Sequence, residues 1–108
     1  MNKVYIIGRI ARDLELKQST DNQTNYLQFP IAINSYSSIN GLETTNFINV
    51  VAFGRKAEVI SQYLSKGRRI SIEGHLNSGS YIDSNNNKKY TTDVILENFD
   101  FIDDKKQA

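Results

Sequence analysis

Phe47-Ile48-Asn49-Val50-Val51-Ala52-Phe53-Gly54 is the stretch of this sequence that decides the fold. In a strand, side chains alternate between two faces, so Phe47 and Phe53 share one face while Val50 lies on the other. A hydrophobic core absorbs one apolar face, but two large rings on the second face need another layer of protein or a flat ligand. Nucleic-acid bases are flat ligands that stack on aromatic side chains. A strand buried on both faces by protein is the alternative interpretation.

Length and composition restrict the chain to one ordinary globular domain. It has 108 residues, of which 39% are hydrophobic and 23% charged, and a chain of this size buries roughly 60 to 70% of its unfolded surface. The first apolar run is too short for a signal peptide, and no run approaches the roughly 18 apolar residues of a membrane span. The absence of cysteine excludes disulfides and thiolate metal sites. We therefore expect a cytoplasmic protein with no membrane partner.

The charge balance is close to neutral. Thirteen basic residues face twelve acidic ones, which gives a net charge of +1. A protein that binds nucleic acid mainly through phosphates is expected to be more basic. If the ligand is nucleic acid, stacking must supply much of the affinity.

The remaining sequence predicts strands around one helix. Strand-like patterns cover residues 3–10, 27–34, 47–53, 69–76 and 90–101. Apolar residues at helical spacing predict a helix over residues 55–66, with Gly67 as its left-handed cap. Polar segments 35–45 and 83–89 read as loops, and the first of them should join two antiparallel strands.

This order of elements is that of an all-β, five-stranded OB-fold barrel with one short helix between strands 3 and 4. A small α+β sheet shares the order and is the alternative. We expect the barrel to cover residues 1–102 and to be followed by a short polar tail at 103–108.

Five motifs in matching order resemble the bacterial single-stranded DNA-binding protein (SSB) family over residues 2–102. They are Asn2-Lys3-Val4 with Ile7-Gly8-Arg9, the segment 47–58, Tyr63-Leu64-Ser65-Lys66-Gly67, Ile72-Glu73-Gly74-His75-Leu76 and Tyr90-Thr91-Thr92-Asp93-Val94. The resemblance implies an OB domain, usually a homotetramer, that coats and protects single-stranded DNA during replication, recombination and repair. It also implies location at the bacterial nucleoid.

The resemblance also implies which aromatic residues stack on bases. Phe47, Phe53 and Tyr81 occupy the positions of the family's stacking rings, and alternation along the strand had already selected the two phenylalanines. Tyr36 lies within about a residue of a further family aromatic, although Ser37 occupies the matching place.

Basic residues near these rings are the candidate phosphate contacts. They are Arg55, Lys56, Lys66, Lys88, Lys89, Lys3 and Arg9, with Arg12 as an extension of the track. Arg55 directly follows the Phe53 face, which favours a phosphate contact. Lys66 lies near the predicted helix end, where a cation is favourable without any ligand.

Three features depart from the family pattern. The segment from Leu76 to Tyr81 lacks the arginines that many members carry there, and the chain has no tryptophan. It also stops after residues 103–108, without the flexible linker and acidic tip by which the family recruits replication and repair enzymes. We therefore do not expect recruitment of replication proteins through this tail.

Two other classes of protein are alternatives. A primosomal accessory protein, such as primosomal replication protein N, has a similar length and fold and acts as a dimer through partner contacts. A metal-dependent nuclease needs clustered ligands, whereas Glu73 with His75 on one strand face and Asp13 with Glu15 on another give only two ligands each. The sequence predicts a binding protein with no cofactor, no metal and no catalytic residues.

Overall fold

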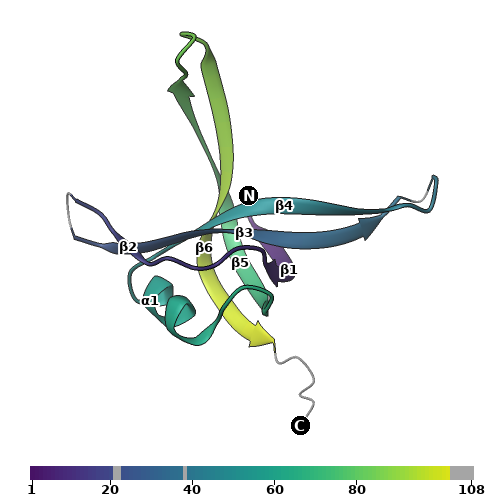
Figure 1. Cartoon of the computed structure of the whole chain (residues 1–108), viewed down its shortest axis with the longest axis horizontal. Coiled ribbons are helices and arrows are strands. Elements are labelled where there is room, and N and C mark those ends of the chain that lie inside the picture. Colours follow the sequence, from purple (N-terminus) through teal and green to yellow (C-terminus); the bar gives the residue numbers. More distant parts are fainter. Residues whose placement is uncertain (21–22, 38, 103–108) are drawn as a thin grey trace.

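The computed structural model describes residues 1–20, 23–37 and 39–102. Its elements, drawn in Figure 1, are β1 (Val4–Ile10), β2 (Lys17–Gln18), β3 (Asn25–Tyr36), β4 (Glu43–Phe53), α1 (Gly54–Tyr63), β5 (Arg69–Ile82) and β6 (Lys88–Ile102). The predicted tail at 103–108 lies outside the described residues. No helix in the described ranges is long and apolar enough to cross a membrane.

Strand pairing closes five strands into a ring. β1 pairs with β5, β5 with β6, β6 with β4, β4 with β3, and β3 returns to β1, while β2 adds two residues to β3. The β4–β6 pairing is parallel and the others are antiparallel. The helix α1 lies between β4 and β5, the third and fourth strands of the ring. The OB-fold prediction is confirmed.

The interior of the ring holds the hydrophobic core. Alternation along β3 turns Leu27, Phe29 and Ile31 inward, and all three are fully buried. The helix covers one end of the barrel with Ala57 and Ile60, which are also buried. Burying each large apolar side chain stabilises the fold by roughly 1.5 to 3 kcal/mol, and this burial is the main contribution to the stability of the barrel.

Two glycines allow strands to approach closely. A Cβ atom on Gly74 would lie under 3.0 Å from the carbonyl oxygen of Ile95, and one on Gly8 would also lie under 3.0 Å from that of Ala32. Gly74 follows a bulge in the β5–β6 pairing, where Glu97 has no partner in the register. A larger residue at either position would collide with the backbone of the neighbouring strand, so both positions require glycine.

Two pairs of strands extend beyond the barrel as arms. One arm is the outer part of the β3–β4 hairpin and the other is the outer part of the β5–β6 hairpin (Figure 1). The expected loop at 35–45 was too long, since β3 continues to Tyr36 and β4 begins at Glu43. The expected strand end at Leu76 was too early, since β5 reaches Ile82.

The predicted helix was also too long. It ends at Tyr63, and Leu64 adopts an extended conformation that turns its side chain into the core. Gly67 does have a positive φ of 93°, but it lies in a turn in which its N–H donates to the Ile10 carbonyl (2.8 Å). Burial of Leu64 therefore decides where the helix stops, and Gly67 is not its cap.

Candidate nucleic-acid interface

The two faces of β4 differ as their alternation predicts. Val50 and Ala52 are fully buried, whereas Phe47 and Phe53 are 64% and 50% exposed. The alternative of a strand buried on both faces is therefore wrong for the described chain. Both rings project from a strand whose inner face packs in the core. This packing fixes the position of the strand, and so of the two rings, without a ligand.

The register of β3 extends this aromatic face. Tyr26 lies opposite Phe53 and Tyr36 lies opposite Glu43, and directly opposed residues of antiparallel strands share a face. Tyr36 is thus exposed on the same side as Phe47, near the end of the arm. Tyr26 was missed in the sequence, although alternation from the buried Leu27 would have placed it on the outer face.

The β5–β6 arm carries one aromatic ring on each face. Tyr81 pairs with Lys89 near the tip and is exposed. Tyr90 lies on the opposite face of this hairpin and is 75% exposed, with Lys88 Nζ 5.6 Å from its ring centroid. Sequence reasoning used Tyr90 only as part of a motif. Counting by two from the buried Val94 places Tyr90 on the core-facing side of its strand, and its ring is exposed because the hairpin extends beyond the barrel.

A groove opens where the two arms separate. Its volume is about 380 Å³, and its walls come from β4 on one side and from β5 and β6 on the other. The lining residues are Phe47, Ile48, Asn49, Leu76, Thr92, Asp93 and Val94. Tyr90 shares the hairpin face of Leu76 and Thr92, so this face continues the groove toward the tip. The groove therefore places apolar and polar groups beside the Phe47 ring.

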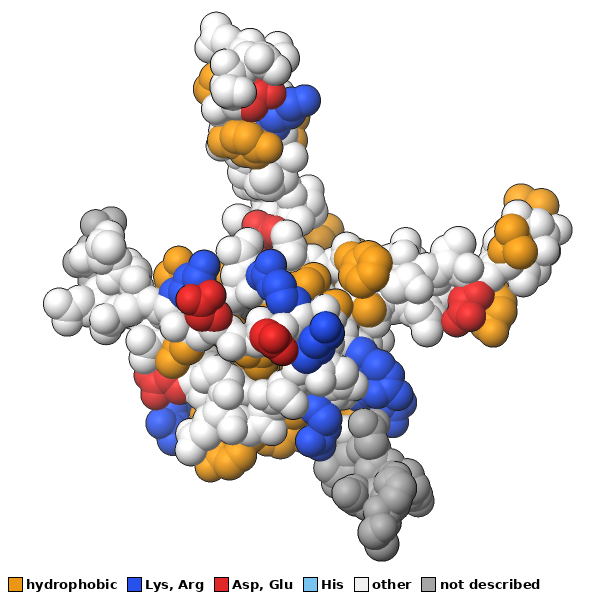
Figure 2. All heavy atoms as spheres, viewed as in Figure 1, with side chains coloured by type: hydrophobic (Ala, Val, Ile, Leu, Met, Phe, Trp, Pro, Cys, Tyr) orange, Lys and Arg blue, Asp and Glu red, His pale blue; other side chains and the backbone are white. Residues whose placement is uncertain are grey.

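The β3–β4 arm carries no lysine or arginine. The sequence holds no lysine or arginine between residues 18 and 54, and Figure 2 shows the β3–β4 arm as mostly uncharged, with hydrophobic patches and one acidic patch and no basic side chain. Arg55 and Lys56 follow Phe53 and Gly54 in the first turn of α1, and both are exposed. Arg55 contacts Glu58 at 3.4 Å, a surface pair that contributes little. Positive charge thus begins where the aromatic face ends.

Lys3 is already paired with two carboxylates. Its Nζ lies 2.6 Å from Glu97 and 3.1 Å from Glu73, and these hydrogen bonds raise its pKa well above the usual range. Glu97 also accepts a hydrogen bond from His75 Nδ1 at 2.6 Å. The pKa of Glu97 is lowered, first by Lys3 and then by His75. These four residues form a hydrogen-bonded network around the bulge.

The other predicted cations lie apart from the Phe47 face or toward the tips. Arg9 Nη1 donates to the Gly67 carbonyl at 2.9 Å, which brings Arg9 beside the turn that contains Lys66. Lys88 and Lys89 lie on the two faces of the β5–β6 tip. Apart from Lys3 and Arg12, the predicted cations therefore fall into a pair at α1, a pair near the Gly67 turn and a pair at the hairpin tip.

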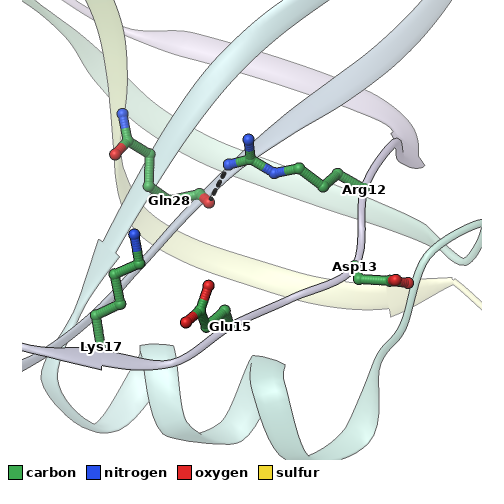
Figure 3. A pocket seen from close by; sticks show the side chains of 5 residues that line it. All are labelled: Arg12, Asp13, Glu15, Lys17 and Gln28. Carbon is green, nitrogen blue, oxygen red and sulfur yellow. Dashed lines mark hydrogen bonds between the residues drawn. The ribbon is translucent and has the colours of Figure 1, made fainter.

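The acidic pairs do not form a metal centre. Figure 3 shows Arg12 donating to the Gln28 carbonyl (3.0 Å), while Asp13 points away from Glu15. These residues and Lys17 line one cavity, so charged side chains of both signs border it. Among the described residues, no group of three or more His, Cys, Asp or Glu side chains could hold a metal ion.

Comparison with known proteins identifies the family. The chain matches the family model described as "Single-strand binding protein family" over residues 1–102. It is 40% identical over 103 residues to the single-stranded DNA-binding protein of Clostridium perfringens, covering 95% of this chain and 67% of that protein. It is 35% identical to single-stranded DNA-binding protein 1 of Clostridium acetobutylicum, covering 100% and 99%.

A solved structure has the same architecture. It is titled "Plasmodium falciparum SSB complex with ssDNA" and superposes with a TM-score of 0.85 at 26% identity, covering 95% of this chain and 96% of that one. The sequence match and the structural match both span nearly the whole chain. The chain therefore belongs to the single-strand binding protein family.

Proposed function

We propose that this chain binds and coats single-stranded DNA without requiring a particular sequence, as part of replication, recombination and repair. The observation that carries this function is the exposed pair Phe47 and Phe53 on the outer face of a strand anchored in the core. Stacking on such rings is available to every base. The names of the Clostridium relatives and the DNA complex of the Plasmodium protein support the same ligand.

The phosphate contacts proposed for this ligand are Arg55 and Lys56 first, because they are exposed and adjoin the Phe53 end of the aromatic face. Lys66, Lys88, Lys89 and Arg9 extend the path in two directions. Lys3 contributes least, since Glu73 and Glu97 already occupy its ammonium group. We assign no catalytic step to the chain. A protein with this ligand acts at the DNA, which in a bacterial cell is the nucleoid.

A preference for single strands tests this function. Labelled oligo(dT) and a blunt duplex of the same length are incubated with the protein and Mg²⁺ and resolved on a native gel. We expect shifted, intact oligo(dT) and much weaker binding of the duplex, because paired bases do not offer their faces to a ring. Equal affinity for the duplex would contradict stacking. No shift would favour the primosomal alternative, and shortened DNA would favour a nuclease.

We propose that self-association uses the open edge of β1. Residues Val4 to Gly8 pair with β5 on one side only, because β3 meets β1 just at Arg9 and Ile10. Tyr5 and Ile7 on this strand are 71% and 56% exposed. An open, apolar strand edge is a site for pairing with another chain. On the neighbouring strand β5, Ile70 and Ile72 are buried in the core and cannot contact another chain.

We expect native mass spectrometry to show a homotetramer, with Ile7→Asp shifting the population to smaller species. A buried carboxylate at this contact would be costly to desolvate. Ile39→Asp, at the exposed tip of the β3–β4 arm, is the matched control and should leave the assembly unchanged. A dominant wild-type monomer at micromolar concentration would contradict the proposal, and a dimer would favour the primosomal alternative.

A further inference from the structure

The groove between the arms lies where β4 and β6 stop pairing. Their parallel register consists of Val50 with Val94 and Val51 with Ile95. One residue before these pairs, the two strands diverge into the two arms of Figure 1, and the groove of about 380 Å³ occupies the fork. At roughly 30 Å³ for each water in the liquid, this space equals about a dozen waters. One nucleobase therefore fits beside the Phe47 ring.

Asn49 and Asp93 form the polar rim of this groove. The register that pairs Val50 with Val94 brings Asn49 alongside Asp93, and both alternate with buried residues, so both lie on the outer side. Asp93 is half-buried and Asn49 is exposed. Neither side chain has a hydrogen bond or ion pair with any residue in the described part of the chain. Two unpartnered polar groups therefore border a space next to a stacking ring.

We propose that this groove is a base-reading subsite that favours bases with an exocyclic amino group over thymine. The proposal rests on the proposed function, because it concerns a base already stacked on Phe47. It adds that one position of the bound strand contributes a chemical preference. Such a preference modifies binding without making it sequence-specific.

The preference follows from the hydrogen-bonding capacity of the two side chains. The ionised carboxylate of Asp93 only accepts hydrogen bonds, whereas the amide of Asn49 both donates and accepts. Cytosine and adenine present an amino donor at the edge where thymine presents the O4 acceptor. A carboxylate therefore attracts the first two and repels the thymine carbonyl. Asn49 can rotate its amide to suit any base, so Asp93 decides the preference.

The carboxylate also determines which part of the DNA enters the groove. A phosphate beside Asp93 would meet a like charge, and no lysine or arginine lines the groove to compensate. A base edge carries no net charge and escapes this repulsion. Unpaired bases in single strands expose their Watson–Crick edges to such contacts. The charge in the groove thus favours the base over the backbone.

Oligo(dT) and oligo(5-methyl-dC) of about 15 nucleotides, within the range that one OB fold covers, are the probes that test this inference. Both bases carry the same ring and methyl group and differ only at the edge that would face Asp93. Fluorescence anisotropy gives the ratio of the two affinities for each variant. We expect Asp93→Asn to lower the preference for 5-methyl-dC over dT by roughly fivefold relative to the wild type. Asn49→Asp, which adds a second acceptor, should raise it.

Asp100→Asn is the matched control, because it removes the same charge from an exposed position on the same strand. It should change both affinities by the same factor and leave their ratio unaltered. A ratio that is identical in wild type, Asp93→Asn and Asn49→Asp would overturn the base-reading subsite while leaving the proposed function intact. Failure of the wild type to bind either oligonucleotide would overturn both.

Discussion

Replacing both Phe47 and Phe53 with alanine is expected to weaken oligo(dT) binding by about 2 to 6 kcal/mol, because stacking contributes roughly 1 to 3 kcal/mol per base. The protein should stay folded, since both rings project outward and their removal leaves the core of β4 unchanged. Fluorescence anisotropy at fixed salt measures the affinity, and circular dichroism measures the fold. Fixed salt matters because phosphate contacts weaken as salt rises.

The single variants and a matched control make this result specific. Phe47→Ala, Phe53→Ala and Tyr81→Ala should each lose about 1 to 3 kcal/mol of binding free energy. Tyr63→Ala removes a similarly exposed ring from α1, where it packs on Phe101, and should leave the affinity nearly unchanged. Unchanged binding by the double variant would show that the DNA follows another face.

Gly74→Ala is expected to destabilise the fold by about 3 kcal/mol, the upper part of the range for added groups in a packed interior. The new Cβ would lie under 3.0 Å from the Ile95 carbonyl oxygen and 3.0 Å from Val94 Cγ1. Backbone of a neighbouring strand cannot swing aside as a flexible side chain can. Since domains of this kind have only about 5 to 15 kcal/mol of stability, urea denaturation should reveal a large shift in midpoint.

Gly79→Ala provides the comparison on the same strand. A Cβ there would approach only the Thr91 hydroxyl at 3.3 Å, and that side chain can rotate. Its cost should stay below about 1 kcal/mol, with some gain because alanine has less backbone freedom to lose. If the two variants had the same denaturation midpoint, the close approach at Gly74 would not limit stability.

The barrel could be predicted because its strands carry a buried face. Phe29 and Val50 belong to period-two patterns, which indicate both that the segment is a strand and which of its faces is buried. Such patterns, with helical spacing in one further segment, predict five strands and one helix. The arms carry no such pattern. In the β3–β4 arm, Thr45 Oγ1 donates to Asn34 Oδ1 (2.9 Å) and Asn46 Nδ2 donates to Ser35 Oγ (3.2 Å). These polar cross-strand pairs form only because the barrel fixes the register of the two strands. The sequence of the arm alone therefore predicts a loop.

The candidate site was predictable to the extent that it follows from alternation within one strand. The exposure of Phe47 and Phe53 is of this kind. The groove at Asn49 and Asp93 joins residues that are distant in sequence, and only the parallel β4–β6 pairing brings them together. The partners of Lys3 are likewise about 70 and 94 residues away. A single sequence gives residue types at these positions but not their neighbours.

The arms have a further consequence for the dynamics of the chain. Their hydrogen-bonded ladders are exposed on both faces, whereas the barrel strands surround fully buried side chains. Amide hydrogens in the arms can exchange with solvent through local opening, while those beside Phe29 and Val50 exchange only when the whole domain unfolds. Amide hydrogens thus exchange at two different rates, faster in the arms and slower in the barrel. An added ligand that slows exchange in one arm therefore covers that arm.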